Sequence, residues 1–453
     1  MEKNLTSGSV LKNTVNFSLP YLLSYFLQTL YGMADLFIIG QFEGVSSTTA
    51  VSIGSQVMHM LTVMIVGLAM GATVFVGRAV GSQNRREAAK GIGNTVTLFM
   101  LLSVSLAVIL LVLVDPIVSV MSTPAEAVSG TEKYLRICFS GIPFITAYNI
   151  ISSIYRGLGD SKSPMYFVAV ACAANIGLDY LFMGALKMGP SGAALGTTVS
   201  QAVSVVSALL FILKKRDSFL LKKSDFRPDG QVMGQILRVG VPVAVQDGFI
   251  QISFVLITVI ANHRGLTDAA AVGIVEKIMG FLFLVPSSML STVSALGAQN
   301  IGAGKPERAR ATLRYAAAIA TGFGVIAATA VNFAAVPMVG LFTSDQAVAA
   351  AGGAYLCGYV FDSLFGGIQF SFSGYFCAVG KSWLSFLHNF LSITFVRIPG
   401  AYFMSKIFAY TLFPMGLASA AGSLFSVIVC VIAYTVITRR GLPVAEGGTD
   451  YNG

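Results

Sequence analysis

The sequence predicts an all-α integral membrane protein whose twelve transmembrane helices form two related six-helix lobes. The chain is 55% hydrophobic and 11% charged, whereas about 25% of the residues in soluble domains are charged. Its apolar residues fall into separate segments of about 20 residues or more, which suffices to cross the hydrocarbon core of a bilayer. Most of the 29 basic residues lie in alternate connections between these segments, as expected for a chain that crosses the membrane repeatedly.

The predicted helices form two sets, with glycine, proline or charged residues at the turns between them. The first set covers residues 14–40, 51–77, 92–114, 132–156, 164–186 and 190–213. The second set covers residues 234–262, 270–296, 311–336, 350–379, 382–410 and 414–438. We expect an N-terminal lobe over 1–213, a cytoplasmic linker over 214–233, a C-terminal lobe over 234–440 and a cytoplasmic tail over 441–453. The first segment is too long for the apolar core of a signal peptide, so it reads as a retained helix.

The distribution of the basic residues, which give the chain a net charge of +9, indicates membrane topology rather than a nucleic-acid-binding surface. Basic residues cluster at alternate connections: from Arg78 to Lys90, at Arg156 and Lys162, and in the long linker from Lys214 to Arg227. The positive-inside rule places these connections, and both chain termini, in the cytoplasm. The five cysteines all lie in apolar segments, so no disulfide framework or metal spacing is indicated. The sequence also lacks a phosphate-binding Gly-x-x-x-x-Gly-Lys loop.

The two halves of the chain resemble each other. At one constant offset Gly81 matches Gly302, Pro116 matches Pro337 and Tyr134 matches Tyr355. Because each half has an even number of helices, the halves share one orientation and are related by an axis along the membrane normal. Paired lobes of this kind enclose a site near the bilayer midplane and alternate its access between the two sides.

An unusual polar pair lies in the fifth apolar segment. Asn175 and Asp179 are four residues apart and therefore share one face of a helix. Such a pair is costly in hydrocarbon, so it must face a protein interior or a water-filled cavity. The same offset pairs the polar residues Asn149, Asn175, Asp179 and Thr197 with Phe370, Val396, Gly400 and Ala418. The architecture therefore does not require these polar groups, and the first lobe looks chemically specialised.

Asp35 is a second intramembrane acid in the same lobe. Gln28 and Tyr31 precede it by seven and four residues, so all three share one helix face. Intramembrane acids commonly mark ion paths. Two such acids close together hold a proton readily in a low dielectric. With amide and hydroxyl oxygens added, Asp35 and Asp179 could instead bind Na⁺, and the residue types alone do not choose between the two ions.

The second half contains three further acids within its apolar segments. Glu276 is followed directly by Lys277, so we expect its charge to be screened or paired near a helix turn. Asp247 and Asp362 stay undecided, and either one could line the second lobe's part of a cavity. Arg397, in the eleventh segment, could neutralise one of these acids.

Several short motifs are similar, in order and spacing, to those of the multidrug and toxic compound extrusion (MATE) family of cation-coupled antiporters, in the MOP superfamily. The resemblance covers essentially the whole chain. Its most specific pieces are Ala34-Asp35-Leu-Phe-Ile-Ile-Gly40, Ser153-Ile-Tyr-Arg156-Gly-Leu-Gly-Asp160, Asn175-Ile-Gly-Leu-Asp179-Tyr, Gly189-Pro-Ser-Gly-Ala-Ala-Leu-Gly-Thr197 and Gly297-Ala-Gln-Asn-Ile-Gly-Ala-Gly-Lys305.

The resemblance implies which residues carry the function. The family's first-lobe cation constellation corresponds to Asp35, Asn149, Asn175, Asp179 and Thr197. Positions that border its substrate cavity correspond to Gln28 and Tyr31, and the expected substrate contacts are Gln28, Tyr31, Asp35, Asp179, Asp247 and Asp362. One departure concerns the second lobe, where some members bind Na⁺ through a carboxylate in the tenth helix. This chain has Gly366 there, and Asp362 lies one turn earlier.

We therefore expect a secondary active antiporter, not an enzyme, that exports amphipathic, cationic organic compounds in exchange for H⁺ or Na⁺. It would need no cofactor besides the coupling ion, and it would act as a monomer in the plasma (inner) membrane. Its partners would be drugs or organic cations and the lipid bilayer, with no nucleic acid. The alternatives within the superfamily are a lipid-linked oligosaccharide flippase or a dedicated metabolite exporter. An enzyme acting on lipids would need a catalytic cluster, and none is visible in the sequence.

Overall fold

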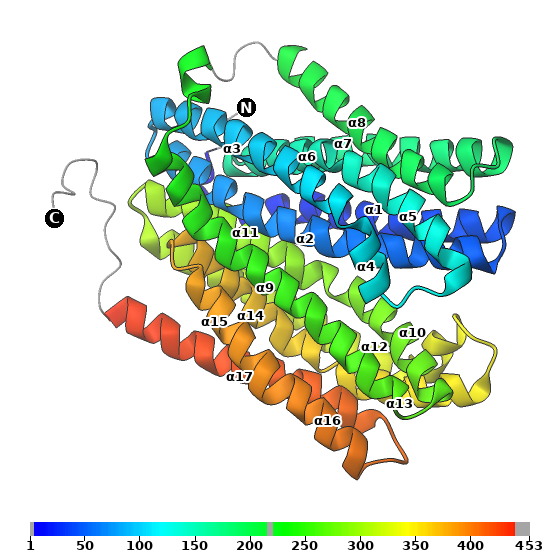
Figure 1. Cartoon of the computed structure of the whole chain (residues 1–453). Helices are drawn as coiled ribbons and strands as arrows, with labels where there is room; N and C mark the ends of the chain where they lie inside the picture. Colours follow the sequence, from blue (N-terminus) through cyan, green and yellow to red (C-terminus); the bar gives the residue numbers. More distant parts are fainter. Residues whose placement is uncertain (1–3, 215–220, 440–453) are drawn as a thin grey trace. The chain divides into compact units, whose positions relative to one another are not determined.

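Figure 1 shows the fold as a computed structural model, which describes residues 4–214 and 221–439. The expected tail over 441–453 and part of the linker lie outside the described residues. All regular elements of the described chain are helical. In the first half they are α1 (Val10–Phe42), α2 (Val45–Gly81), α3 (Arg85–Val112), α4 (Val114–Val120), α5 (Ala125–Ser140), α6 (Ile142–Gly157), α7 (Lys162–Asp179), η1 (Tyr180–Ala185) and α8 (Pro190–Lys214).

The second half follows the short linker helix η2 (Lys223–Phe226). Its elements are α9 (Gly230–Asn262), α10 (Leu266–Leu282), α11 (Leu284–Gly302), α12 (Pro306–Gly340), α13 (Gln346–Tyr359), α14 (Asp362–Ala378), α15 (Trp383–Ser392), η3 (Ile393–Arg397), α16 (Ile398–Ile407) and α17 (Phe413–Arg439). Each of the apolar segments predicted from the sequence coincides with one of these helices or with a run of them.

The helices confirm an all-helical membrane protein. Within the described residues, 9 helices are long and apolar enough to span a bilayer, and up to 11 if two bent pairs each count as one span. The bent pairs are α5 with α6, at 48°, and α13 with α14, at 43°. The remaining predicted span, 382–410, is divided into α15, η3 and α16. Pro399 lies at the start of α16, where its missing N–H interrupts the regular hydrogen-bond ladder.

The chain divides into two compact units. The first unit contains Leu19–Val80 and Asn84–Leu237, and the second contains Asn4–Ser18, Gly81–Gln83 and the chain from Arg238 onward. Helices α1 and α9 therefore each contribute residues to both units. The boundary in α1 lies just before Pro20, and the boundary in α9 lies a few residues before Pro242. A proline inside a helix removes one backbone hydrogen bond and favours a bend.

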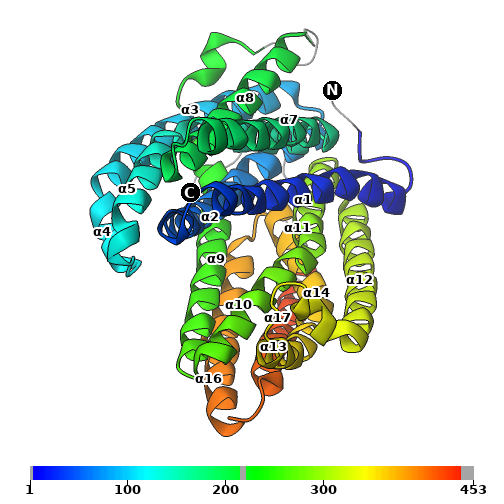
Figure 2. The ribbon, with the colours of Figure 1, turned by 90° about the vertical axis from the view of Figure 1, so that its right-hand side faces the viewer.

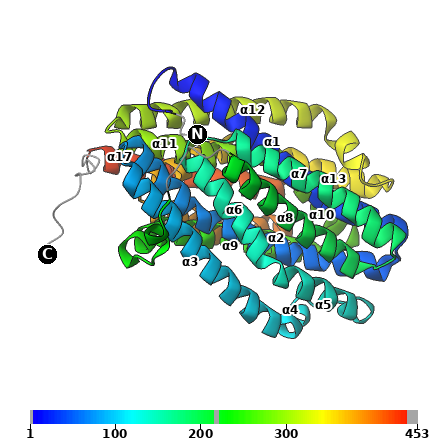
Figure 3. The ribbon, with the colours of Figure 1, turned by 90° about the horizontal axis from the view of Figure 1, so that it is seen from above.

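In the first unit α8 packs against α5, α6 and α7, and α3 packs against α5 and α6. Helix α3 leads through α4 into α5 (Figure 3). A buried apolar cluster contains Ile38 and Ile39 of α1, Leu135 of α5 and Ala193 of α8. This cluster holds α1 against α5 and α8 directly beside Asp35, so burial of apolar side chains positions a polar one.

The part of the linker that follows residue 220 is fixed to α3. The amide of Asn94 donates to the carbonyl of Asp225 at 3.1 Å, and its oxygen accepts from the N–H of Asp229 at 2.7 Å. Arg86 and Lys90 form ion pairs with Asp225 and Asp229, each at 2.6 Å. These contacts attach η2 and the start of α9 to the first unit.

In the second unit α14 is the central helix. It packs against α11, α12 and α17, and Figure 2 shows α12 and α14 side by side. Helices α13 and α17 approach closely because Gly358 and Gly416 face each other's helix, where an added Cβ would strike backbone atoms. Buried aromatic residues Tyr355 and Tyr359 of α13 lie in the resulting core.

Candidate functional site

Three helices of the first unit bring two carboxyl groups together in its interior. Asp35 of α1 is 4% exposed, and Asp179, at the end of α7, is fully buried. The hydroxyl of Thr197 of α8 donates to Oδ2 of Asp35 at 3.1 Å. Asp179 and Asn175 also border the Asp35 carboxyl group. The helices therefore converge on one polar cluster of four predicted site residues.

A glycine on α8 makes room for this cluster. Gly196 faces Asp179, and a Cβ at position 196 would overlap Oδ1 of that side chain. Glycine at this position lets the α8 backbone approach the carboxyl group directly, which no other residue would allow. The sequence motif contained Gly196, but its role depends on contact with α7 and could not be read from the chain alone.

The cluster has unused oxygen atoms that suit a proton or a small cation. Among the described residues, Oδ1 of Asp35, both carboxyl oxygens of Asp179 and the amide of Asn175 make no ordinary hydrogen bond. Buried polar atoms usually have partners, so these unpartnered atoms are available to a proton or a small cation. Within the part of the chain that the structure describes, no three His, Cys, Asp or Glu side chains are grouped so that they could hold a metal ion.

Tyr31 extends the cluster along α1. Its hydroxyl accepts a hydrogen bond from Nε2 of Gln201 at 3.3 Å. Gln201 lies one turn after Thr197 on α8, so both polar side chains lie on the helix face toward α1. The sequence prediction missed Gln201, although its four-residue spacing from Thr197 was a usable signal.

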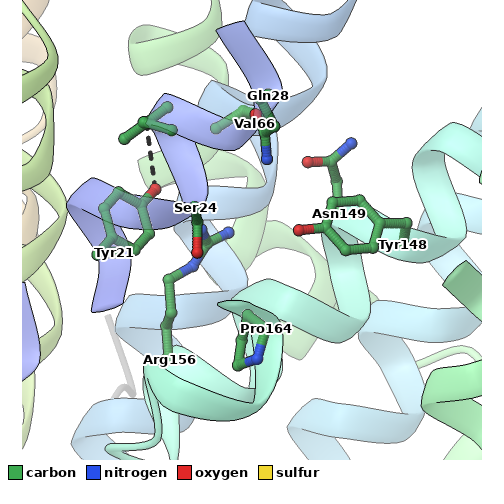
Figure 4. Close-up of a pocket in the computed structure, with 9 residues that line it drawn as sticks. Tyr21, Ser24, Gln28, Val66, Tyr148, Asn149, Arg156 and Pro164 are labelled. Carbon is green, nitrogen blue, oxygen red and sulfur yellow. Dashed lines mark hydrogen bonds between the residues drawn. The ribbon is translucent and has the colours of Figure 1, made fainter. Parts of the chain in front are cut away.

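Gln28 and Asn149 border a separate cavity in the first unit (Figure 4). This cavity is bounded by α1, α2, α6 and α7. Its volume is only about 10 Å³. That is room for about one water, whereas sites for drug-sized ligands have volumes of about 300–1,000 Å³. The predicted set is therefore divided between this narrow cavity and the Asp35–Asp179 cluster.

Arg156 also borders the cavity, which corrects the sequence interpretation. The charge pattern assigns it to a cytoplasmic connection, but its side chain is only 9% exposed. Its guanidinium lies over the ring of Tyr21, 4.8 Å from the centroid, and donates to Ser153 at 3.1 Å. Figure 4 shows it directed upward between Tyr21 and Pro164. Its spacing of seven residues from Asn149 places both on one face of α6.

The acids of the second unit do not behave alike. Glu276 was expected to be screened or paired near Lys277, and its carboxyl accepts a hydrogen bond from the Thr258 hydroxyl at 3.3 Å. The charge of Arg397 acts on both Glu276 and Asp362. Asp247 lies elsewhere in the unit, near Cys377. Two of the three acids thus share the electrostatic environment of one arginine.

The family profile described as MatE matches the chain twice, at residues 20–181 and 242–403. This double match confirms the internal repeat. The matched segments start at residues 20 and 242 and end at residues 181 and 403, so their equivalent ends are 222 residues apart.

Similar proteins are known along nearly the whole chain. The probable multidrug resistance protein YpnP of Bacillus subtilis is 27% identical over 397 residues, which cover 87% of this chain and 88% of YpnP. The multidrug export protein MepA of Staphylococcus aureus is 24% identical and covers 89% of both chains. An outward-facing multidrug resistance MATE transporter of the MOP superfamily has the same fold, with a TM-score of 0.88 at 21% identity, covering 96% of this chain and 98% of that one. The chain belongs to the MATE family of membrane transporters.

Proposed function

We propose that this protein is a secondary active antiporter that exports amphipathic, cationic organic compounds in exchange for H⁺ or Na⁺. The observation that carries the proposal is the meeting of Asp35 and Asp179 in the buried interior of the first unit, beside Thr197. The multidrug proteins YpnP and MepA, which resemble this chain along most of its length, support the substrate class.

The Asp35–Asp179 cluster would bind and release the coupling ion once in each transport cycle. With one proton or one Na⁺ bound, one of the two negative charges is neutralised and the carboxylates repel each other less. Without it, their negative charge attracts an organic cation, whose burial would otherwise be costly. The ion and the drug cation would therefore compete for the same carboxylates, which is the requirement for exchange.

Helix α1 is the element best placed to transmit this change. It carries Asp35 and Tyr31, and it contains Pro20 and Gly32. We propose that ion binding changes how α1 packs and that the helix bends near Gly32 during the cycle. Bending there would close the space that a drug occupies and would drive its release.

The positive-inside rule supports an orientation with both termini in the cytoplasm. We propose a location in the plasma membrane, a monomeric state, and lobes at 1–213 and 234–440 joined by the linker at 214–233. Substrates would be drugs or other organic cations drawn from the cytoplasm or the bilayer.

The test is efflux from reconstituted vesicles with a fluorescent organic cation such as ethidium. An imposed pH or Na⁺ gradient identifies the coupling ion, and Asp179→Asn tests the site in the same experiment. We expect Asp35→Asn and Asp179→Asn to abolish gradient-driven export while the purified protein stays folded. Asp115→Asn is the matched control, because Asp115 is 71% exposed and pairs only with surface Arg136. Full transport by both site variants contradicts the proposal.

A further inference from the structure

One positively charged side chain borders the narrow cavity of the first unit that Figure 4 shows. Among the described residues that line this cavity, Arg156 is the only charged one, and none is an acid. Arg156 lies in the last turn of α6. The cavity therefore has the opposite charge to the Asp35–Asp179 cluster of the same unit.

The described residues supply no anionic partner for Arg156. Its side chain is only 9% exposed. It donates to the hydroxyl of Ser153 at 3.1 Å, and its guanidinium carbon lies 4.8 Å from the ring centroid of Tyr21. A guanidinium has several further N–H donors. Buried charges are normally paired with an opposite charge, so this arginine is an exception that requires an explanation.

The acid closest to Arg156 in the sequence is bound elsewhere. Asp160 follows one turn later and is also buried. Its Oδ1 accepts from the N–H groups of Lys162 and Ser163, at 3.0 Å and 3.2 Å, and its Oδ2 accepts from the Ser163 hydroxyl at 2.6 Å. These bonds hold the carboxylate at the start of α7. The part of the chain that the structure describes thus leaves the charge of Arg156 uncompensated.

Other hydrogen-bond donors lie around the same space. Figure 4 shows the guanidinium of Arg156 and the hydroxyl of Tyr148 facing each other across the cavity, with the amide of Gln28 above them. A phenol hydroxyl and an amide N–H can each donate to an anion. Arg156 and Tyr148 belong to α6 and Gln28 belongs to α1. Three donors from two helices can therefore surround one small ion.

The size of the cavity limits the ligand to about one atom. Its volume of about 10 Å³ is room for about one water. Carboxylate and phosphate groups, which a guanidinium commonly binds, have too many atoms for this space. A chloride ion is only slightly larger than a water molecule. A water molecule would also fit, but it cannot balance the positive charge of Arg156.

We propose that this cavity is a chloride site, in which Arg156, Tyr148 and Gln28 donate to one chloride ion. The ion neutralises Arg156 next to Gln28 and Asn149, two of the residues predicted to serve transport. An organic cation that approaches these two residues then meets no net positive charge. The site uses neither Asp35 nor Asp179, so it goes beyond the proposed cation exchange.

Thermal unfolding of the purified protein in nanodiscs tests the site. Sodium chloride replaces sodium gluconate at constant Na⁺ concentration, because gluconate is too large for the cavity. The unfolding midpoint of the wild type should rise with chloride in a saturable manner, whereas that of Arg156→Gln should not respond. Arg136→Gln is the matched control, because Arg136 is 52% exposed and pairs with Asp115; it should respond as the wild type does. A wild type that does not respond to chloride, or an equal response of Arg156→Gln, would overturn the proposal and leave a water-filled cavity.

Equilibrium binding of radioactive ³⁶Cl⁻ provides a readout that does not require Arg156→Gln to fold. The wild type should bind one chloride per chain, and Tyr148→Phe, which removes one hydroxyl donor, should bind it several-fold more weakly. Absence of saturable binding to the wild type, or an unchanged affinity in Tyr148→Phe, contradicts the proposed site. Asp179→Asn should bind chloride as the wild type does. Failure of the chloride site is therefore recognised separately from failure of the antiport proposal, which is seen as full export by Asp35→Asn and Asp179→Asn.

Discussion

Gly196→Ala should disable the candidate cation site without removing any of its polar groups. The added Cβ would overlap Oδ1 of Asp179, at a distance well below the 3.0 Å that real Cβ atoms keep. To regain ordinary contact, the carboxyl group must move by about 1 Å or α8 must withdraw by a similar distance. Overpacking of this kind costs about 1–3 kcal/mol in a well-packed interior.

The expected functional loss is larger than the loss of stability. A displacement of about 1 Å in a site that depends on exact placement lowers activity by up to about 10²-fold. The assay is gradient-driven export of ethidium from proteoliposomes, normalised to the amount of reconstituted protein. Unfolding of the purified variant is measured in parallel, because export must fall further than the folded fraction does.

Gly177→Ala is the matched control. Gly177 lies on α7 two residues before Asp179, and a Cβ at this position meets no atom within 4 Å. Alanine is favoured over glycine in a helix by about 1 kcal/mol, so this variant should export normally and be no less stable. If Gly196→Ala exports at the wild-type rate, the close approach of α8 to Asp179 has no functional role and the reasoning is refuted.

Three further predictions concern other parts of the chain. In Gly32→Ala the added Cβ meets no atom within 4 Å, and the substitution should stabilise a straight α1 by about 1 kcal/mol. If bending limits the transport cycle, export should slow about fivefold. Unchanged export argues against a bend at this position. Asn94→Ala removes two hydrogen bonds to the linker, which contribute about 1 kcal/mol each. The substitution should therefore accelerate amide hydrogen exchange at the start of α9. Unchanged exchange contradicts the attachment of α9 to α3. The hydrogen bond from Lys90 lowers the pKa of Asp229. The stabilisation that this hydrogen bond provides is therefore fully present above the ordinary aspartate pKa near 4, and it is lost only as the pH falls through the lowered pKa of Asp229. Lys90→Met should move that loss to higher pH, as followed by hydrogen exchange corrected for its intrinsic pH dependence.

Much of the first-unit cluster could be predicted because intramembrane acids are costly and have few structural uses. Asp35, Asn175, Asp179 and Thr197 were identified from their placement in apolar segments and from the family resemblance. The structure brings these four together. Gln28 and Asn149 belonged to the same prediction but border a separate cavity. Gln28 lies two turns before Asp35 on α1, and a helix face several turns long can serve two sites, whereas Asn149 lies on α6.

Errors in the prediction arose where a charge was interpreted from its sequence neighbours. Arg156 is the last residue of the predicted span 132–156 and was assigned to the following connection, yet it lies in the last turn of α6 and is buried against Tyr21. Glu276 precedes Lys277, but consecutive residues on a helix point in different directions. Its carboxyl accordingly meets Thr258 of α9.

The sequence by itself determined the class of the protein, the positions of its helices and the repeat, because these follow from the length and spacing of apolar segments. It also placed each polar residue on a face of its own helix, since a helix has a fixed period. Only the tertiary structure decided which faces meet. Asp35 and Thr197 are 162 residues apart in the chain and share a hydrogen bond, and Arg397 donates a hydrogen bond to Tyr359, which lies 38 residues earlier. Such contacts depend on how whole helices pack, which no local pattern specifies.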